Sequence, residues 1–403
     1  MASATTHSSM PDCPACGERD LVPLVDLPGV PVIVNALTHT RAEALAAPRG
    51  DIRLVYCRAC GLVFNAAFDP ALMHYDGVYE NALHFSAHFQ KYAEDLAQDL
   101  VASFVLKNKR IVELGCGDGS FLSRLCELGS NEGFGFDPAF DPNRSAIKPG
   151  VSAKVTRELY TSKTTLPPPD FVSCRHVLEH IDRPRDFVND LWKAMQSRKG
   201  AGLFFEVPDC TYMLDTLAIW DIIYEHTNYF TAGAMSRLFA KAGFEVLNAS
   251  TVYSGQFLTL KARVPSAASA SKPIPADDAS TLAKVERFGA EHRKKVEHWR
   301  KVLAELKSTR KRAVLWGAGS KGVTFLNTFQ KELSSTDSVL AHAVDLNPRK
   351  HGCFIVGAGQ EIVAPDALKK IQPSVVVIMN PIYKDEIARK LRDLGIKAEV
   401  MIA

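Results

Sequence analysis

Two pairs of cysteines have the spacing of a metal site. The segments CPAC (13–16) and CRAC (57–60) each place two thiols two residues apart. This spacing lets both sulfurs of a pair reach one ion from a tight turn, and two such turns complete a tetrahedral site. A glycine follows each pair, where the turn needs a permissive backbone. The pattern predicts a structural zinc ion with no coordination position left open, bound by Cys13, Cys16, Cys57 and Cys60.

A glycine-rich turn is the second feature that could do chemistry. The segment VELGCGDG ends an apolar run and contains Gly115, Gly117 and Gly119. Glycines here let the backbone approach a ligand at the end of a buried strand. Glu113 stands just before the turn, and Asp137 ends the next apolar run, where a carboxylate can bind both hydroxyls of a ribose. A plain strand–turn–helix and a nicotinamide dehydrogenase are the alternative interpretations.

A second glycine turn lies near the other end of the chain. In AVLWGAGSKG (313–322), Gly317, Gly319 and Gly322 form G-x-G-x-x-G, and Asp345 follows a later apolar run. Backbone N–H groups at a helix N-terminus suit a pyrophosphate, and Lys321 adds a positive charge. The alternative is a degenerate Rossmann half that only packs against the rest of the protein.

The histidines in HVLEH (176–180) match the H-x-x-E-H pattern of some zinc proteases. That chemistry needs both histidines on one helix. His176 directly follows an apolar run, so we expect it in a loop at a strand end. A metalloprotease is therefore the minor interpretation, and a second zinc ion per chain would favour it.

Composition narrows the class of protein. The chain has 403 residues, 46% of them hydrophobic and 23% charged, with a formal net charge of +3. These values predict two or three globular domains and argue against electrostatic binding of nucleic acid or a membrane. The first residues lack the apolar core of a secretion signal, and no run of apolar residues is long enough to span a bilayer. We therefore expect a cytoplasmic protein with reduced thiols.

The elements that must position these residues follow from hydrophobic periodicity. Short apolar strands alternate with helices from 110 to 263, which predicts an α/β fold with a parallel sheet covered on both faces. A helix is expected over 84–107. Residues 265–280 are rich in Pro, Ala and Ser, as in a linker, and 281–309 have the spacing of an amphipathic helix. A second, smaller α/β unit begins after it.

The first glycine turn resembles motif I of class I S-adenosylmethionine-dependent methyltransferases, and FVSCRHVLEHI resembles the fourth-strand segment of that fold. The whole chain resembles the sugar C-methyltransferases, which act on nucleotide-linked 4-keto-6-deoxysugars. The matching segments are CPACG, CRACGLVFN, VELGCGDGSFL, IYEHTNYF (223–230) and WGAGSKG with VDLNPRKHG (316–352).

The resemblance implies a domain order. Residues 1–75 form a small zinc-binding domain and 76–264 a central Rossmann-like methyltransferase domain. Residues 265–310 are a linker and helix, and 311–403 form a small Rossmann-like domain that binds the nucleotide part of the substrate. The implied partner is a nucleotide-linked keto-sugar, with no nucleic acid and no membrane, for a monomer or weak homodimer.

The resemblance also implies roles for single residues. His226 is the general base, Glu225 orients or polarises it, and His180 and Tyr79 line the sugar pocket. Tyr224 is a further candidate catalytic residue. S-adenosylmethionine is bound by Glu113, Gly115, Gly117, Asp137 and His176. The nucleotide is bound by Gly317, Gly319, Lys321 and Asp345. Family members often read Tyr-x-Glu-His, whereas Ile223 occupies the place of that tyrosine here. The remaining alternatives are methyl transfer to another acceptor and a binding module without activity.

Overall fold

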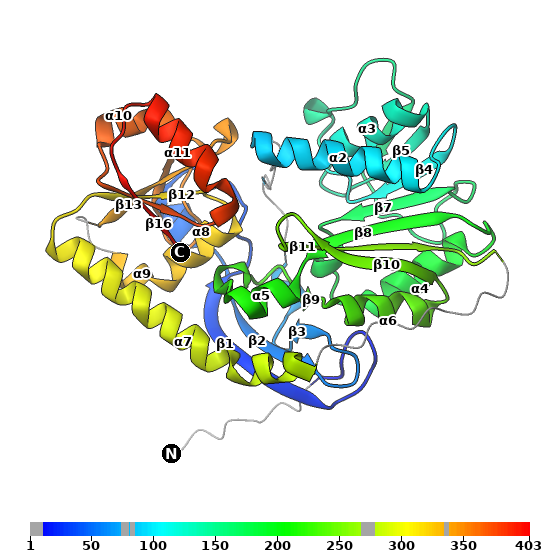
Figure 1. Ribbon diagram of the computed structural model, residues 1–403, viewed down its shortest axis with the longest axis horizontal. Coiled ribbons are helices and arrows are strands. Elements are labelled where there is room, and N and C mark those ends of the chain that lie inside the picture. The colour runs from blue at the N-terminus through cyan, green and yellow to red at the C-terminus, as the bar shows by residue number, and fades with distance from the viewer. Residues whose placement is uncertain (1–10, 74–79, 81–84, 267–278, 334–337) are drawn as a thin grey trace.

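Three β-sheets, one for each part of the chain, form the framework of the protein (Figure 1). The computed structural model describes residues 11–73, 80, 85–266, 279–333 and 338–403. Figure 1 shows the central and C-terminal sheets side by side, with the N-terminal sheet and a long helix beneath them.

The central sheet has seven strands in the order β10-β11-β8-β7-β4-β5-β6. All neighbours are parallel except β11, which is antiparallel to both β8 and β10. The order reverses between β4 and β7, so ligands are expected at the carboxyl ends of these strands. The strands are β4 (Arg110–Leu114), β5 (Glu132–Phe136), β6 (Ala153–Thr156), β7 (Phe171–Arg175), β8 (Gly202–Pro208), β10 (Glu245–Val252) and β11 (Phe257–Arg263).

Helices cover both faces of this sheet, as the sequence predicted. Helices α2 (Ala87–Ser103) and α3 (Ser120–Gly129) bury Leu100 and Leu122 against one face. Helices α4 (Pro184–Met195) and α6 (Ala232–Ala242) bury Val188 and Phe239 against the other. The strands between them read as nearly continuous apolar runs, because each has both faces in the core.

The N-terminal sheet has the order β1-β2-β3-β9 and is antiparallel. Its strands are β1 (Leu21–Pro31), β2 (Arg49–Cys57), β3 (Val63–Asn65) and β9 (Asn228–Tyr229), with α1 (Arg41–Leu45) between the first two. Strand β9 comes from the middle of the chain, far from the other three in sequence. Val63 pairs with Tyr229, so the segment around His226 is fixed to the N-terminal sheet.

The C-terminal sheet is parallel throughout, with the order β14-β13-β12-β15-β16. Its strands are β12 (Ala313–Trp316), β13 (Leu340–Val344), β14 (Glu361–Val363), β15 (Val375–Ile378) and β16 (Glu399–Ile402). Helices α8 (Ser320–Thr328), α9 (Gln330–Leu333), α10 (Leu368–Ile371) and α11 (Lys384–Asp393) accompany it. This is the second α/β unit expected from the sequence.

The long helix α7 (Ala279–Ser308) joins the N-terminal and C-terminal sheets. Its apolar stripe is buried, with Val285 and Phe288 at one end and Trp299 and Leu303 further along. Gly289 permits close packing, because a Cβ there would lie 2.5 Å from the carbonyl oxygen of Leu24. The amphipathic helix predicted from the sequence is therefore confirmed, and its stripe packs against β1.

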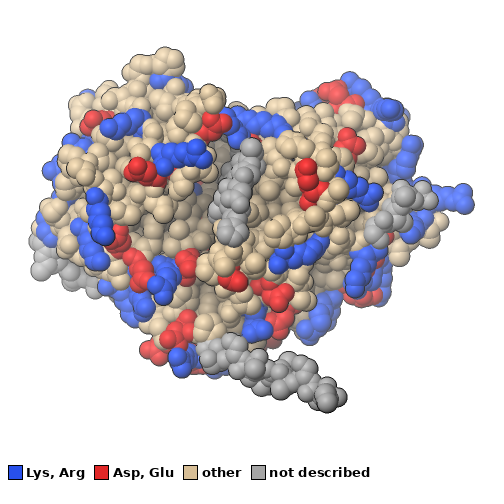
Figure 2. Space-filling view, turned by 180° about the vertical axis from the view of Figure 1, so that it is seen from behind, with Lys and Arg blue, Asp and Glu red and all other residues tan. Residues whose placement is uncertain are grey.

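Surface charge agrees with the composition. Figure 2 shows lysines and arginines intermixed with acidic residues on the face that it draws. Among the described helices, none is both long enough and apolar enough to cross a membrane.

Candidate functional site

The four cysteines of the two pairs come together at one end of the N-terminal sheet. The Sγ atoms of Cys13 and Cys60 lie 3.6 Å apart, as do those of Cys16 and Cys57. All four sulfurs are within 4.8 Å of one another. The two turns have the same geometry, since the glycine after each pair has a positive φ and its N–H donates to the carbonyl of the first cysteine. Each turn thus presents two sulfurs to a common centre.

The chemistry of the cluster favours a cation at that centre. Burial and the charge of Cys13 raise the pKa of Cys57 to about 12. Four thiolates so close together repel one another and are poorly hydrated. A divalent cation removes both penalties, and a set of four sulfurs is typical of structural zinc. The residues therefore fit a zinc ion.

The first glycine turn has the shape that the sequence predicted. Gly115, Gly117 and Gly119 all have positive φ, between β4 and α3. A Cβ on Gly115 would lie 2.2 Å from Val177 Cγ2, so the turn packs tightly against the segment after β7. A Cβ on Gly117 would meet nothing within 4 Å. The backbone at Gly117 is thus open to a ligand.

Asp137 follows β5 and faces this turn. Its Oδ2 accepts a hydrogen bond from the Gly117 N–H at 2.8 Å, and its Oδ1 accepts one from the Ala139 N–H at 2.8 Å. Glu113 is 97% buried within β4, and its Oε2 has no hydrogen-bond partner among the described residues. Burial raises the pKa of Glu113 to about 8. With this pKa the Glu113 carboxyl is mostly protonated at neutral pH while no ligand is bound. A ligand that carries positive charge, as S-adenosylmethionine does, would favour the ionised carboxylate, so the buried group and the open turn fit such a ligand.

A buried ionic cluster stands beside the turn at the ends of β7 and β8. Glu206 is fully buried and accepts hydrogen bonds from Arg175 Nη2 at 2.9 Å and from the hydroxyl of Tyr92. His176 Nε2 lies 3.0 Å from Glu206 Oε1. Burial would raise the pKa of Glu206, but Arg175 and His176 outweigh it and lower that pKa to about 2. Glu206 is therefore ionised at neutral pH.

His176 is the residue of this cluster that the sequence singled out. It has a φ of 54°, which is unusual for a residue with a side chain and fixes the bend after β7. Burial lowers the pKa of His176, but Glu179 and Glu206 outweigh that effect and raise it to about 9. The imidazole is therefore charged at neutral pH. Sequence analysis missed Glu206 and Arg175, although a charged residue at the end of each apolar strand was the available signal.

The C-terminal glycine turn repeats this arrangement in the second Rossmann-like unit. Asp345 Oδ2 accepts a hydrogen bond from the Ala318 N–H at 2.8 Å, as Asp137 does from Gly117. A Cβ on Gly317 or Gly319 would meet nothing within 4 Å. One on Gly322 would lie 2.0 Å from the carbonyl oxygen of Gly317, so this glycine lets α8 pack against the turn.

One cavity of about 330 Å³ lies between the central sheet and the C-terminal sheet. His176, His180 and His226 line one side of it, and Gly317, Gly319, Lys321 and Asp345 line the other. Ile223, which occupies the place of the tyrosine in the family that the sequence resembles, also lines the cavity. Glu113, Gly115, Gly117 and Asp137 are outside this lining.

The two central histidines of the cavity face each other. The ring centroids of His180 and His226 are 4.9 Å apart and nearly perpendicular. Burial, then the charges of His180, His176 and Lys321, lower the pKa of His226 well below its usual value. His226 is therefore a neutral imidazole at physiological pH, able to accept a proton.

Glu225 and Tyr224 point toward the N-terminal domain. Glu225 is fully buried, and its Oε2 accepts a hydrogen bond from the Val34 N–H at 2.8 Å. The Tyr224 hydroxyl accepts a hydrogen bond from the Asp69 N–H at 2.8 Å, and its ring contacts Phe68. Neither residue lines the cavity. Tyr79, which the resemblance places at the sugar pocket, lies outside the described residues.

The segment HVLEH does not form the helix that a protease site would need. His176 lies in the bend after β7, and Leu178–His180 form a single 3₁₀ turn, η3. Glu179, His180 and His226 have ligand-type atoms within 4.8 Å of one another. This set differs from the H-x-x-E-H pair, because it replaces His176 with His226.

Polar contacts that the sequence did not reveal hold the two sides of the cavity together. Gln256 and Asn380 exchange two amide hydrogen bonds, of 3.0 and 2.8 Å. The hydroxyls of Tyr253 and Tyr383 are 2.8 Å apart. Lys321 forms an ion pair with Asp221, in the 3₁₀ turn η4 (Ile219–Asp221). These pairs join residues more than 90 positions apart, so no local pattern indicates them.

Three solved structures that are similar to part of this chain are distant from it in sequence. A putative methyltransferase from a Haloferax volcanii complex with the Trm112 methyltransferase activator is 14% identical, covers 45% of this chain and 96% of its own, and has a TM-score of 0.36. An S-adenosylmethionine-dependent methyltransferase from Clostridium acetobutylicum is 11% identical, with 43% and 92% covered and a TM-score of 0.35. One from Mesorhizobium loti is 17% identical, with 42% and 97% covered and a TM-score of 0.34.

Family models give the identification. No curated protein matches the chain significantly. The model of a methyltransferase domain matches residues 88–249, which contain the first glycine turn and both cavity histidines. The model of a C-methyltransferase C-terminal domain matches residues 266–402, which contain the second glycine turn. The chain is therefore an S-adenosylmethionine-dependent C-methyltransferase.

Proposed function

We propose that this enzyme methylates the carbon next to the keto group of a nucleotide-linked 4-keto-6-deoxysugar, with His226 as the general base. The observation that carries the proposal is the shared cavity. A neutral histidine and a Rossmann-type glycine turn line opposite sides of one space. An acceptor with a reactive sugar at one end and a diphosphate at the other suits such a space.

The reaction begins with removal of a proton from carbon. A neighbouring carbonyl acidifies that C–H bond, and His226 accepts the proton. The negative charge that develops on the carbonyl oxygen is stabilised by cations, and both Lys321 and the charged His176 line the cavity. S-adenosylmethionine, when bound, supplies the electrophilic methyl group.

The cofactor and nucleotide residues follow from the two glycine turns. Glu113, Gly115, Gly117, Asp137 and His176 hold S-adenosylmethionine, with the Asp137 carboxylate on the ribose hydroxyls. Gly317, Gly319, Lys321 and Asp345 hold the nucleotide end of the acceptor. Glu225 is a positioning residue, because its bond to Val34 fixes the segment that carries His226. Zinc at the four cysteines is structural, and the enzyme works in the cytoplasm without nucleic acid or membrane.

The second candidate function is methyl transfer to a different acceptor. Ile223 favours it, because the cavity has an apolar side chain where family members often present a hydroxyl. The acceptor would then be a hydroxyl, an amine or a non-sugar ketone, and the position of the new methyl group separates these cases.

The first test combines purified protein, S-adenosylmethionine and a panel of nucleotide-linked 4-keto-6-deoxysugars. We expect a product one methyl group heavier by mass spectrometry, with the methyl on carbon by NMR. The His226→Asn variant should keep the fold and lose about 10²–10⁴-fold in kcat, because it removes the general base. A methyl group on oxygen or nitrogen, or wild-type turnover by His226→Asn, would contradict this mechanism.

The pH dependence of kcat tests the state of His226. Only the neutral imidazole accepts a proton, and its pKa lies below the usual value. We therefore expect kcat to stay near its maximum at pH 6.5 and to fall only at lower pH. Lys321→Met removes one of the charges that lower this pKa, so its acidic limb should move to higher pH. An acidic limb of the wild type centred above pH 6.5 would show that His226 is not the titrating base.

Asp137 is tested by cofactor binding. Asp137→Ala removes a carboxylate that accepts hydrogen bonds from the ribose, which are worth about 1.5–3 kcal/mol for a charged acceptor. We expect the affinity for S-adenosylhomocysteine, measured by calorimetry, to fall roughly 10-fold or more. Glu127→Gln, on the exposed side of α3, is the control and should bind normally. Equal affinities in the two variants would exclude the ribose role.

The metal content tests the cysteine cluster. Elemental analysis should find one zinc ion per chain, lost in Cys57→Ser together with a lower melting temperature, because binding energy is folding energy at such sites. Cys353→Ser, a buried cysteine outside the cluster, should keep its zinc. A second ion per chain would instead point to Glu179, His180 and His226 as metal ligands.

A further inference from the structure

A single buried carboxylate connects all three parts of the protein. The Glu80 side chain is 1% exposed. Its Oε1 accepts a hydrogen bond from Asn347 Nδ2 at 3.0 Å, and its Oε2 pairs with Arg349 Nη1 at 3.2 Å. Oε2 also pairs with Arg144, in the methyltransferase domain. The Glu80 N–H donates to the carbonyl oxygen of Asn35, in the N-terminal part, at 2.9 Å.

The partners of Glu80 lie on two equivalent loops. Arg144 ends η2 (Pro142–Arg144), seven residues after Asp137. Asn347 and Arg349 belong to the loop that begins with Asp345. Each Rossmann-like unit therefore has one such loop. The loop starts with the aspartate, Asp137 or Asp345, that accepts a hydrogen bond from the glycine turn of the same unit. Glu80 joins the loop after β5 to the loop after β13.

The charge of Glu80 makes this junction strong. Burial would raise the pKa of Glu80, but the hydrogen bond from Asn347 and the charges of Arg144 and Arg349 outweigh it, and the pKa is lowered. The carboxylate is thus ionised at neutral pH. The two arginine side chains keep 27% and 39% of their surface exposed. If the carboxylate is removed, they can still be hydrated, so its loss need not unfold the protein.

We propose that Glu80 couples the binding of S-adenosylmethionine to the binding of the nucleotide end of the acceptor. The nucleotide half of this inference rests on the proposed function. A ligand on either glycine turn restrains the loop that starts with the neighbouring aspartate. Because Glu80 bonds to both loops, restraining one also restrains the other. The second ligand then meets a loop already held in place and binds more tightly.

Other contacts hold the two units together independently of Glu80, so the coupling between the loops can be measured separately. The Gln256–Asn380 and Tyr253–Tyr383 pairs bind the units to each other without touching either loop. They remain when Glu80 is changed. A variant at Glu80 therefore separates coupling between the loops from cohesion between the domains.

The experiment measures S-adenosylhomocysteine binding by calorimetry, with and without saturating thymidine diphosphate, and again with uridine diphosphate. For the wild type we expect one of the two nucleotides to tighten binding about 5-fold or more, the lower end of typical coupling. S-adenosylhomocysteine should tighten binding of that nucleotide by the same factor. In Glu80→Gln the factor should fall to about one, with each ligand still binding alone.

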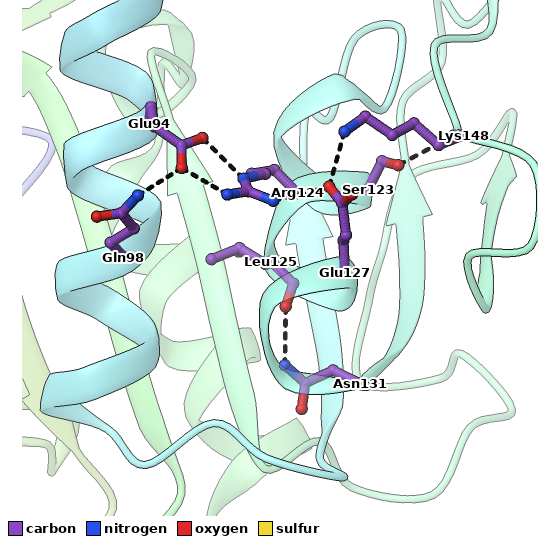
Figure 3. Close-up of polar contacts among 8 residues, drawn as sticks. All are labelled: Glu94, Gln98, Ser123, Arg124, Leu125, Glu127, Asn131 and Lys148. Carbon is purple, nitrogen blue, oxygen red and sulfur yellow. Dashed lines mark hydrogen bonds and ion pairs between the residues drawn. The ribbon is translucent and has the colours of Figure 1, made fainter.

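Three further variants separate coupling from a general loss of stability. Arg144→Gln cuts the bond to the loop after β5, and the double variant Asn347→Ala with Arg349→Gln cuts both bonds to the loop after β13. Either should abolish the coupling. Arg124→Gln is the matched control, because Arg124 donates to Glu94 at 2.7 Å in an ion pair within the methyltransferase domain (Figure 3). This variant should keep the full coupling factor. Melting temperatures of all variants report any effect on stability.

The outcomes separate this inference from the proposed function. If the wild type binds both ligands with no coupling, or if Glu80→Gln keeps the wild-type factor, the role of Glu80 is overturned. Formation of the methylated sugar is unaffected by either result. If neither nucleotide binds, the proposed coupling and the proposed nucleotide site are both contradicted. Intact coupling without a methylated sugar would overturn only the choice of acceptor.

Discussion

The position of His226 depends on the pairing of a short central segment with the N-terminal domain. Strand β9 pairs with β3 on one side of this histidine, and Glu225 binds the Val34 N–H on the other. Tyr224 adds a third attachment through Asp69. The base is therefore held by a domain that also contacts the C-terminal glycine turn, where Asn35 Nδ2 donates a hydrogen bond to Ser320 Oγ at 3.2 Å. Residues around the cysteine cluster pack against the methyltransferase core. Loss of the cluster would therefore disturb the N-terminal sheet and, through that sheet, the residues that line the cavity.

One structural arrangement occurs twice in the protein, and of its two copies only the C-terminal one lines the cavity. In each Rossmann-like unit an aspartate after the second strand accepts a hydrogen bond from the glycine turn after the first strand. The carboxylate thus fixes a turn whose glycines have no side chains to fix it themselves. In each unit this aspartate also begins a loop, and a side chain of each loop bonds to the Glu80 carboxylate. The two glycine turns are consequently linked by a chain of bonds, from each turn to its aspartate, along the loop that follows, and to the Glu80 carboxylate. This link exists in addition to the packing of the domains against each other.

Sequence patterns predicted the features that are local in the chain. The cysteine spacing, the three-glycine turns and the stripe of α7 each depend on residues a few positions apart, and each has a direct physical reason. The cavity could not be predicted in this way, since it forms between units separated by the linker. The orientation of Glu225 and Tyr224 was also hidden, because it depends on β9 joining a sheet made by residues 21–65. Glu206 is an intermediate case, because its charge within an apolar strand is a local feature, but the residue was missed and the sequence does not indicate its partner.

The charges around His226 have opposite effects on the proton acceptor and on the carbon acid in the proposed proton transfer. Lys321 and the protonated His176 lower the pKa of His226, which makes it a weaker base. The same positive charges stabilise the anion that forms on the carbonyl oxygen when the proton leaves. In the proposed reaction, the positive charges that weaken the base therefore also lower the energy of the enolate that the proton leaves behind. Ile223 contributes no hydroxyl to this oxygen, so in the proposed reaction the stabilisation rests on the cations of the cavity rather than on the tyrosine common in the family.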